Sequence, residues 1–157
     1  MYQNKEAINS DSATVWSNIT MKKNRSSTDF QKQFSKESTE STELLQKAVS
    51  FYQKGDPIEA CKFCQQILKN QPSHVDALYL LSALAWQTGN YTLSLNSFNH
   101  LIKLQPDNPE IFFNYAKLLT KLNRPEEALA SFNKAIELRP DFLEAYINRG
   151  IVLRALN

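Results

Sequence analysis

Glycine is scarce in this chain, which has only 3 glycines in 157 residues. The β-branched residues also form no alternating runs. Sandwiches and barrels need both frequent turn residues and a two-residue alternation of apolar and polar side chains. The composition therefore disfavours those folds. The hydrophobic fraction of 42% is sufficient for one packed domain of another kind.

The sequence also lacks long apolar runs and a strong excess of charge. No apolar run approaches the roughly 18 residues that a transmembrane helix requires. Residues 1–10 include Lys5 and Glu6 and have no apolar core of the kind found in a secretory signal. The net charge of +2 gives no strong field for nucleic acid or for a membrane surface. With 2 cysteines and no export signal, we expect the chain in the reducing cytoplasm.

Residues 1–40 differ in composition from the rest of the chain. They are rich in Ser, Thr, Asn, Gln and Lys, and their few apolar residues are scattered. Such a segment cannot bury enough surface to offset the entropy lost on ordering, so we expect a mostly disordered N-terminal tail. Phe30 and Phe34 are spaced to share one face of a short helix, which would cover the following segment or act as a recognition peptide.

From residue 41 onward the chain repeats every 34 residues. Pro72, Pro106 and Pro140 are spaced by this period (106 − 72 and 140 − 106), and a similar turn surrounds each of them. The period divides the region 41–157 into four units, of which the last is incomplete. The units are 41–74, 75–108, 109–142 and 143–157.

Equivalent positions of the units carry residues of the same kind. Position four is large and apolar, positions eight and twenty are small, and position fifteen tolerates a left-handed backbone conformation. This pattern predicts a helix, a tight turn and a second helix in each unit. The proline near the end of the unit then stops the second helix. One hairpin cannot bury its own apolar face, so the units must stack to form a core. The residues at these positions are Leu44, Leu78, Phe112 and Tyr146; Ala48, Ser82, Ala116 and Gly150; Ala60, Ser94 and Ala128; and Gly55, Gly89, Asn123 and Asn157.

At these positions, residues 41–157 resemble the tetratricopeptide repeat family. The resemblance implies an all-α fold, an α-solenoid of antiparallel helical hairpins. It also implies a protein–protein interaction module, not an enzyme, that binds a peptide or a helix in its concave groove. Asn123 and Asn157 stand where the family usually has glycine. Pro57 and Pro125 fall in the first turn of a second helix, where proline is tolerated.

In this family the first helix of each unit lines the concave face, which implies a set of ligand-facing residues here. Their amides would pair with the backbone of an extended peptide, and their aromatic rings would serve as anchors. Lys117, Lys121 and Arg154 favour an acidic partner. Alternatively, the same residues form an ordinary solvated helix face. The set is Gln46, Tyr79, Trp86, Phe113, Asn114, Lys117, Lys121, Asn148 and Arg154.

Two known types of ligand-binding groove in the family can be compared with this set. Asn114 and Asn148 stand one repeat apart, which resembles the asparagine ladder of O-linked N-acetylglucosamine transferases. This resemblance implies an alternative function: the substrate-recognition array of a glycosyltransferase whose catalytic domain would lie downstream. The carboxylate clamp of the family needs Lys and Asn where this chain has Leu45 and Val49, so a clamp is disfavoured.

No group of residues in the sequence predicts catalysis, a cofactor or a metal site. Cys61 and Cys64 form a Cys-x-x-Cys pair inside a predicted helix, whereas a redox pair would stand at a helix N-terminus. A zinc site would need two further ligands at a suitable spacing. We therefore expect both cysteines to be structural. Without a basic stripe, RNA binding is also disfavoured.

The last unit predicts a helix with an uncovered apolar side. Tyr146, Leu153 and Leu156 would lie on that side with no partner helix. Repeat arrays usually end in a unit with a polar outer face. We therefore expect that the chain is the N-terminal part of a longer protein or a truncated gene product. The exposed last helix is also a candidate for self-association with a second copy of the chain.

Overall fold

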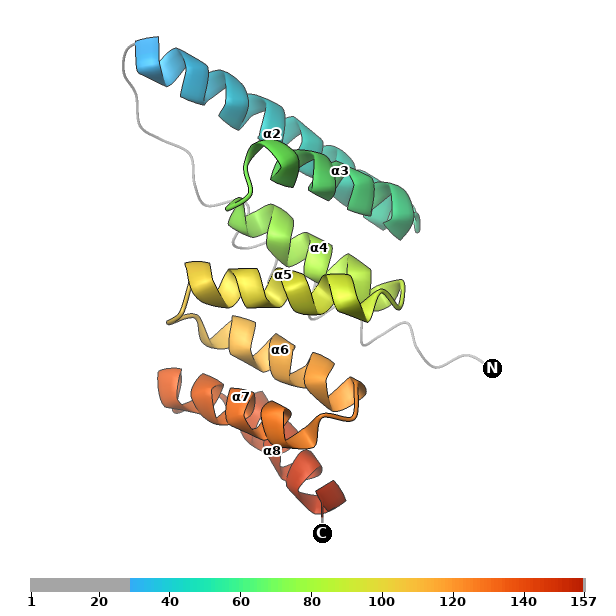
Figure 1. Ribbon diagram of the computed structural model, residues 1–157, viewed down its shortest axis with the longest axis vertical. Helices are drawn as coiled ribbons and strands as arrows, with labels where there is room; N and C mark the ends of the chain where they lie inside the picture. The colour runs from blue at the N-terminus through green and yellow to red at the C-terminus, as the bar shows by residue number, and fades with distance from the viewer. Residues whose placement is uncertain (1–28, 157) are drawn as a thin grey trace. The chain divides into compact units, whose positions relative to one another are not determined.

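The computed structural model describes residues 29–156, and for residues 29–38 it describes only the backbone. This part of the chain consists of seven α-helices and contains no strand, which confirms the all-α prediction (Figure 1). The helices are α2 (Asp29–Gln53), α3 (Pro57–Asn70), α4 (Val75–Gln87), α5 (Tyr91–Leu104), α6 (Pro109–Lys121), α7 (Pro125–Leu138) and α8 (Leu143–Leu156). The chain divides within α4 into an N-terminal unit, up to Leu80, and a C-terminal unit, from Leu81.

The first described helix begins within residues 1–40, the segment predicted to be a tail. α2 starts at Asp29, so the segment 29–40 is helical. Phe30 and Phe34 both fall within α2, although their side chains are outside the described part. The rest of the expected disordered tail, residues 1–28, lies outside the described residues.

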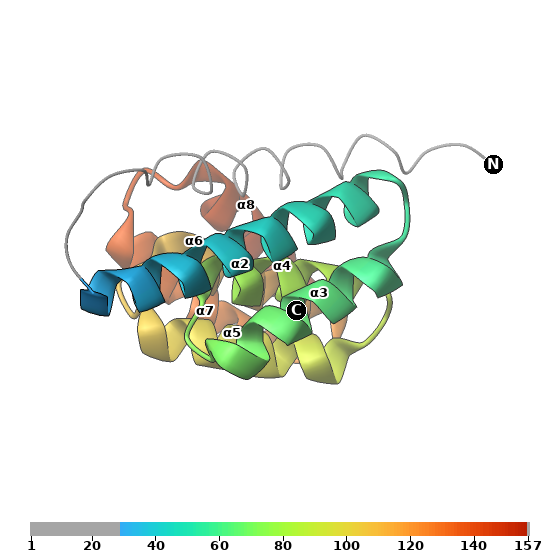
Figure 2. The same cartoon turned by 90° about the horizontal axis from the view of Figure 1, so that it is seen from above.

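In the N-terminal unit, α2 and α3 form a helical hairpin (Figure 2). The turn between them contains Gly55 at a φ of +82°, a conformation that glycine adopts without the strain of a Cβ. Asp56 then caps α3, because its carboxylate accepts a hydrogen bond from the N–H of Glu59 at 3.1 Å. Pro57 occupies the first turn, as predicted. The buried apolar residues of the hairpin are Leu44, Leu45, Ala48, Val49, Ala60, Cys64 and Ile67.

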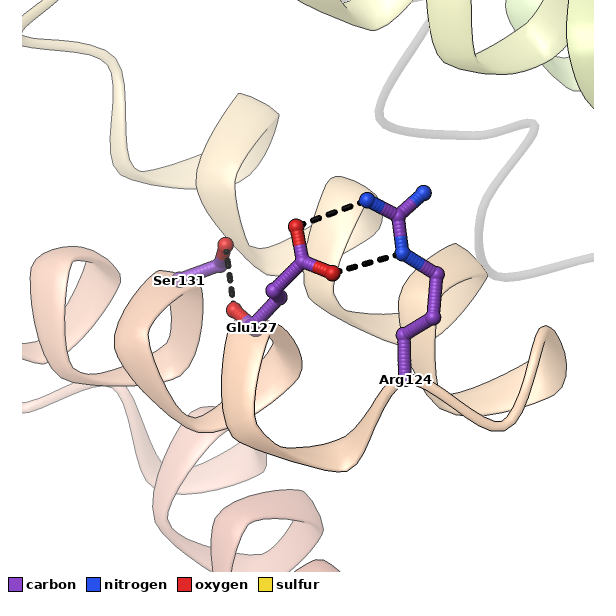
Figure 3. Close-up of polar contacts among 3 residues, drawn as sticks. All are labelled: Arg124, Glu127 and Ser131. Atoms are coloured by element: carbon purple, nitrogen blue, oxygen red, sulfur yellow. Dashed lines mark hydrogen bonds and ion pairs between the residues drawn. The ribbon is translucent and has the colours of Figure 1, made fainter.

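The C-terminal unit contains the next two hairpin turns, and both adopt the predicted left-handed backbone. Gly89 has a φ of +77° and Asn123 a φ of +57°. After the second turn, Arg124 Nε and Nη2 donate to the two carboxylate oxygens of Glu127 at 2.6 and 2.7 Å (Figure 3). The hydrogen bonds from Arg124 lower the pKa of Glu127. In the same first turns of α7, the Ser131 hydroxyl donates to the Glu127 carbonyl at 3.0 Å.

The predicted small positions allow the helices of each hairpin to lie close together. Positions eight and twenty are 0% exposed in the first three repeats, at Ala48, Ala60, Ser82, Ser94, Ala116 and Ala128. At one of these contacts, the Ser94 hydroxyl of α5 donates to the Ser82 carbonyl of α4 at 2.9 Å. The packing predicted from the repeat is therefore confirmed at these positions.

Aromatic rings fill the core of the C-terminal unit. The Phe113 ring of α6 lies 4.7 Å from the Phe142 ring and 6.0 Å from the Phe132 ring of α7, measured between centroids. The tilted geometry of both pairs is favourable for aromatic rings. Ala145 and Val152 of α8 complete the cluster. This core holds α6, α7 and α8 together and so fixes the outward faces of α6 and α8.

Candidate functional site

One side of α6 carries three polar residues in a single row. Asn114, Lys117 and Lys121 are separated by three and four residues, which places them above one another along a helix. Asn114 and Lys117 are half-buried, whereas Lys121 is exposed. We call these three residues the α6 row. It presents an amide and two ammonium groups along one helix face.

The α6 row lies beside the C-terminal end of α4. Lys117 Nζ is 5.9 Å from the centroid of the Trp86 ring and 5.3 Å from that of the Phe113 ring. Both distances are within the range of a cation–π contact, which is roughly 6 Å. Trp86 is itself half-buried. A partly exposed indole and a positive charge are therefore held next to each other.

Phe113 does not lie on the surface, where it was predicted. Its side chain is only 8% exposed and belongs to the core between α6 and α7. The ring turns inward because Phe132 and Phe142 offer it two aromatic neighbours. This finding corrects the prediction that Phe113 faces a ligand. The Phe113 ring still contacts the candidate surface through the ammonium group of Lys117.

The two candidates on α8 lie on different sides of that helix. Asn148 is half-buried, and its Nδ2 donates to the Glu144 carbonyl at 2.7 Å. Arg154 is exposed and lies six residues later, which corresponds to about 120° around a helix of about 100° per residue. One peptide lying along α8 would therefore contact one of these residues more readily than both.

The remaining candidates belong to the N-terminal unit. Gln46 is exposed on α2, and Tyr79 is half-buried in the first half of α4. Leu45 and Val49, which stand at the positions of the clamp residues, are 5% and 8% exposed. They are therefore part of the packing of this unit and offer no polar groups to a carboxylate.

The cysteine pair has the properties of packing residues. Cys64 is 0% exposed, and both thiols are free inside α3. Burial, with a smaller effect of the neighbouring Cys61, raises the pKa of Cys64 to about 12, and burial also raises the pKa of Cys61. Both groups are therefore protonated near pH 7, where a catalytic cysteine would need to be a thiolate.

Among residues 39–156, whose side chains the structure describes, no group of three His, Cys, Asp or Glu side chains is placed to hold a metal ion. None of the helices there combines the length and the apolar character needed to cross a membrane.

Arg139, a residue without a predicted role, joins several elements of the C-terminal unit. Its guanidinium lies over the Phe142 ring and also pairs with Glu110 of α6. At the equivalent position the other units have Gln71 and Gln105, so the repeat pattern gave no signal for this residue.

Comparison with known proteins agrees with the repeat pattern. The family model described as tetratricopeptide repeat matches residues 45–109, 84–142 and 113–157. Together these matches extend from residue 45 to residue 157, which is more than half of the chain. No curated protein matches the sequence.

Several solved structures share this arrangement of helices. An O-GlcNAc transferase mutant from Thermobaculum terrenum is 26% identical with a TM-score of 0.65; the match covers 74% of this chain but only 22% of that enzyme. A tetratricopeptide repeat protein from Parabacteroides merdae is 26% identical with a TM-score of 0.71, over 75% of this chain and 47% of that one. The first repeat domain of Spaghetti (RPAP3), bound to the HSP90 peptide SRMEEVD, has a TM-score of 0.70 at 16% identity, over 75% of this chain and 94% of that one.

Proposed function

Because the chain belongs to the tetratricopeptide repeat family, we propose that it is a protein-interaction module that binds a peptide of a partner protein. The binding surface in this proposal is the α6 row together with Trp86. The ligand is an extended segment with acidic side chains. The observation that carries the proposal is the position of Lys117, a member of the α6 row, with its Nζ 5.9 Å from the centroid of the half-buried Trp86 ring.

Each component of this surface has a role in the proposed complex. The side-chain amide of Asn114 can donate to and accept from a peptide backbone. Lys117 and Lys121 supply two positive charges on the same face of α6 for acidic side chains. Trp86 offers a ring of the kind that anchors many protein interfaces. The proposed role of this chain is binding alone.

A direct test compares charge variants of α6 in a peptide-binding assay. We propose to measure fluorescence anisotropy of synthetic peptides that have one backbone length and differ in their number of acidic residues. The variant Lys117→Glu, Lys121→Glu is expected to weaken binding of the acidic peptides by about tenfold or more, because two attractions become repulsions. Binding to the unchanged chain should also weaken as salt is added.

The matched control for this test is Lys69→Glu, Lys103→Glu, which changes the net charge by the same amount at exposed lysines of α3 and α5. Both replacements reverse a charge outside the proposed surface. This variant should bind the acidic peptides as the unchanged chain does. Equal loss of binding in both variants would show a response to net charge only and would refute the α6 surface.

A second candidate function is the recognition of glycosyltransferase substrates. Its support is the similarity to the Thermobaculum terrenum enzyme over 74% of this chain, together with the one-repeat spacing of Asn114 and Asn148. In this function the asparagines hold the peptide backbone, so binding depends little on the charge of the ligand. The double variant Asn114→Ala, Asn148→Ala should then weaken the binding of acidic and of neutral peptides equally. The charge reversals on α6 should have little effect.

A further inference from the structure

Lys117 and Lys121 place two like charges one turn apart on α6. Because four residues separate them, their side chains leave the same face of the helix at levels about 6 Å apart. The sequence between Ile111 and Pro125 contains no Asp or Glu, so α6 supplies no carboxylate within one turn of either lysine. By contrast, Lys134 of α7 forms an ion pair with Glu137, three residues away. Like charges at this spacing destabilise a helix, and an acidic ligand would relieve their repulsion.

The two lysines differ in how firmly their ammonium groups are held. Lys117 Nζ lies 5.9 Å from the centroid of the Trp86 ring and 5.3 Å from that of the Phe113 ring. Lys117 is also half-buried, whereas Lys121 is exposed. A charge that is ordered and partly shielded from water attracts an opposite charge more strongly than a fully solvated one. Lys117 is therefore the stronger of the two contacts for an acidic side chain.

The side chains of an extended peptide have a spacing that can be compared with that of the two lysines. Neighbouring side chains point to opposite sides, and side chains two residues apart lie on the same side at about 6.6–6.8 Å. Side chains three residues apart are about 10 Å apart and again point to opposite sides. Of these spacings, only the two-residue one places two carboxylates on one side at nearly the separation of Lys117 and Lys121.

We propose that the partner of this surface carries two acidic residues separated by one residue of any type, and that their carboxylates pair with Lys117 and Lys121. This inference rests on the proposed function and adds to it the sequence pattern of the ligand. The two carboxylates neutralise both ammonium groups at once, so this pattern binds more tightly than two acidic residues at another spacing.

Asn114 has a separate role in this complex. It stands one turn before Lys117, about 4.5 Å along the helix. That distance is more than one residue and less than two residues of an extended peptide, so it does not match a third side chain of the acidic row. It matches the backbone beside the acidic residue that meets Lys117. The side-chain amide can both donate to and accept from that backbone, whatever the neighbouring residue is.

The test compares peptides of one length and composition that differ only in the spacing of two glutamates. They contain Glu-Glu, Glu-x-Glu or Glu-x-x-Glu in a background of serine and glycine, and fluorescence anisotropy gives their dissociation constants with the whole chain. Glu-x-Glu should bind more tightly than the other two by about fivefold or more, because it alone reaches both lysines together. A peptide with glutamine at both positions gives the level of binding that is independent of charge.

Single lysine variants locate the origin of this preference. In Lys117→Ala and in Lys121→Ala only one of the two charges remains, so the three acidic peptides should bind within about twofold of one another. Lys117→Ala should weaken the binding of Glu-x-Glu more than Lys121→Ala does. Lys103→Ala on α5 is the matched control, because it removes an exposed lysine outside the surface, and the preference should persist. Circular dichroism checks that each variant stays helical.

The outcomes separate this inference from the proposed function. Equal affinities of the three acidic peptides for the unchanged chain, with loss of binding in Lys117→Glu, Lys121→Glu, would overturn the spacing and leave the proposed function in place. A preference that persists in both single alanine variants would overturn the pairing with these lysines. Acidic peptides that bind no more tightly than the glutamine peptide would overturn the proposed function as well.

Discussion

The guanidinium of Arg139 lies over the ring of Phe142, with its central carbon 3.5 Å from the ring centroid. The same side chain donates from Nη2 to Oε1 of Glu110. Arg139 directly follows α7, Phe142 directly precedes α8, and Glu110 lies in the first turn of α6. One side chain thus connects the ends of three helices in the C-terminal unit.

Replacing Arg139 should destabilise the fold. We expect Arg139→Ala to lower the free energy of unfolding by about 1–2 kcal/mol, mostly through loss of the stacked contact. The ion pair with Glu110 contributes less, because both side chains are partly exposed, at 35% and 28%. The stability of Arg139→Lys should lie between those of the unchanged chain and Arg139→Ala, because an ammonium group keeps the charge but cannot stack flat on a ring. Urea denaturation followed by circular dichroism measures these differences, with Lys103→Ala on α5 as the control. Equal stabilities of Arg139→Ala and that control would contradict the role given to Arg139.

The sequence predicted the features that recur in every repeat and missed those that occur once. Ala48, Ala116 and Asn123 were identified because equivalent positions carry equivalent residues, and one physical requirement explains each set. At the equivalent positions of the second unit a different contact is made, in which Asn108 Nδ2 donates to Gln105 Oε1 at 3.0 Å. Because the residue types change, periodicity contains no signal for the stacking of Arg139 on Phe142. It depends on a distance that only the folded chain defines.

The candidate binding surface was predicted less completely than the fold. The resemblance to the family was sufficient to name Asn114, Lys117 and Lys121 as ligand-facing candidates on one helix. It could not show that Phe113 turns into the core, because this depends on aromatic neighbours contributed by α7 and by the turn before α8. The uncovered apolar side of the last helix was predicted at Tyr146, Leu153 and Leu156, and all three side chains are exposed.

Substitutions of two glycines by alanine should have opposite effects. Gly89 has a φ of +77°, so Gly89→Ala should lower the free energy of unfolding by about 1 kcal/mol. Gly150 lies within α8 without a positive φ, so Gly150→Ala should raise it by about 0.5–1 kcal/mol. Thermal or urea denaturation at low protein concentration measures both without a contribution from self-association. If both substitutions changed the free energy of unfolding in the same direction, the backbone conformations given for Gly89 and Gly150 would be contradicted.

A buried serine tests how closely α4 and α5 approach each other. Ser94 is 0% exposed and donates to the Ser82 carbonyl at 2.9 Å. Ala60 and Ala128 occupy the equivalent position in other repeats, so Ser94→Ala should cost less than about 1 kcal/mol. Ser94→Leu adds volume where the helices touch and should cost about 1–3 kcal/mol or more. Denaturation curves measure the free energy of unfolding of both variants. Equal stabilities of Ser94→Leu and Ser94→Ala would contradict this packing.

The burial of Cys64 should make the stability of the chain depend on alkaline pH. Desolvation raises the pKa of its thiol to about 12, from an ordinary value of 9.0. Below pH 9 the thiol keeps its proton in both the folded and the unfolded chain, so its contribution does not change there. Between pH 9 and 12 the unfolded chain ionises first, which favours unfolding as pH rises.

The measurement is the difference in unfolding free energy between the unchanged chain and Cys64→Ala at pH 7 and pH 10. At pH 7 the variant should be less stable, because a fully buried side chain has been shortened. At pH 10 the gap should narrow by about 1 kcal/mol, because only the unchanged chain has a thiol at position 64 to ionise on unfolding. Burial also raises the pKa of Tyr115, but that effect is common to both chains and cancels in the comparison. A gap of the same size at both pH values would mean that Cys64 is more accessible to water than its position within α3 implies.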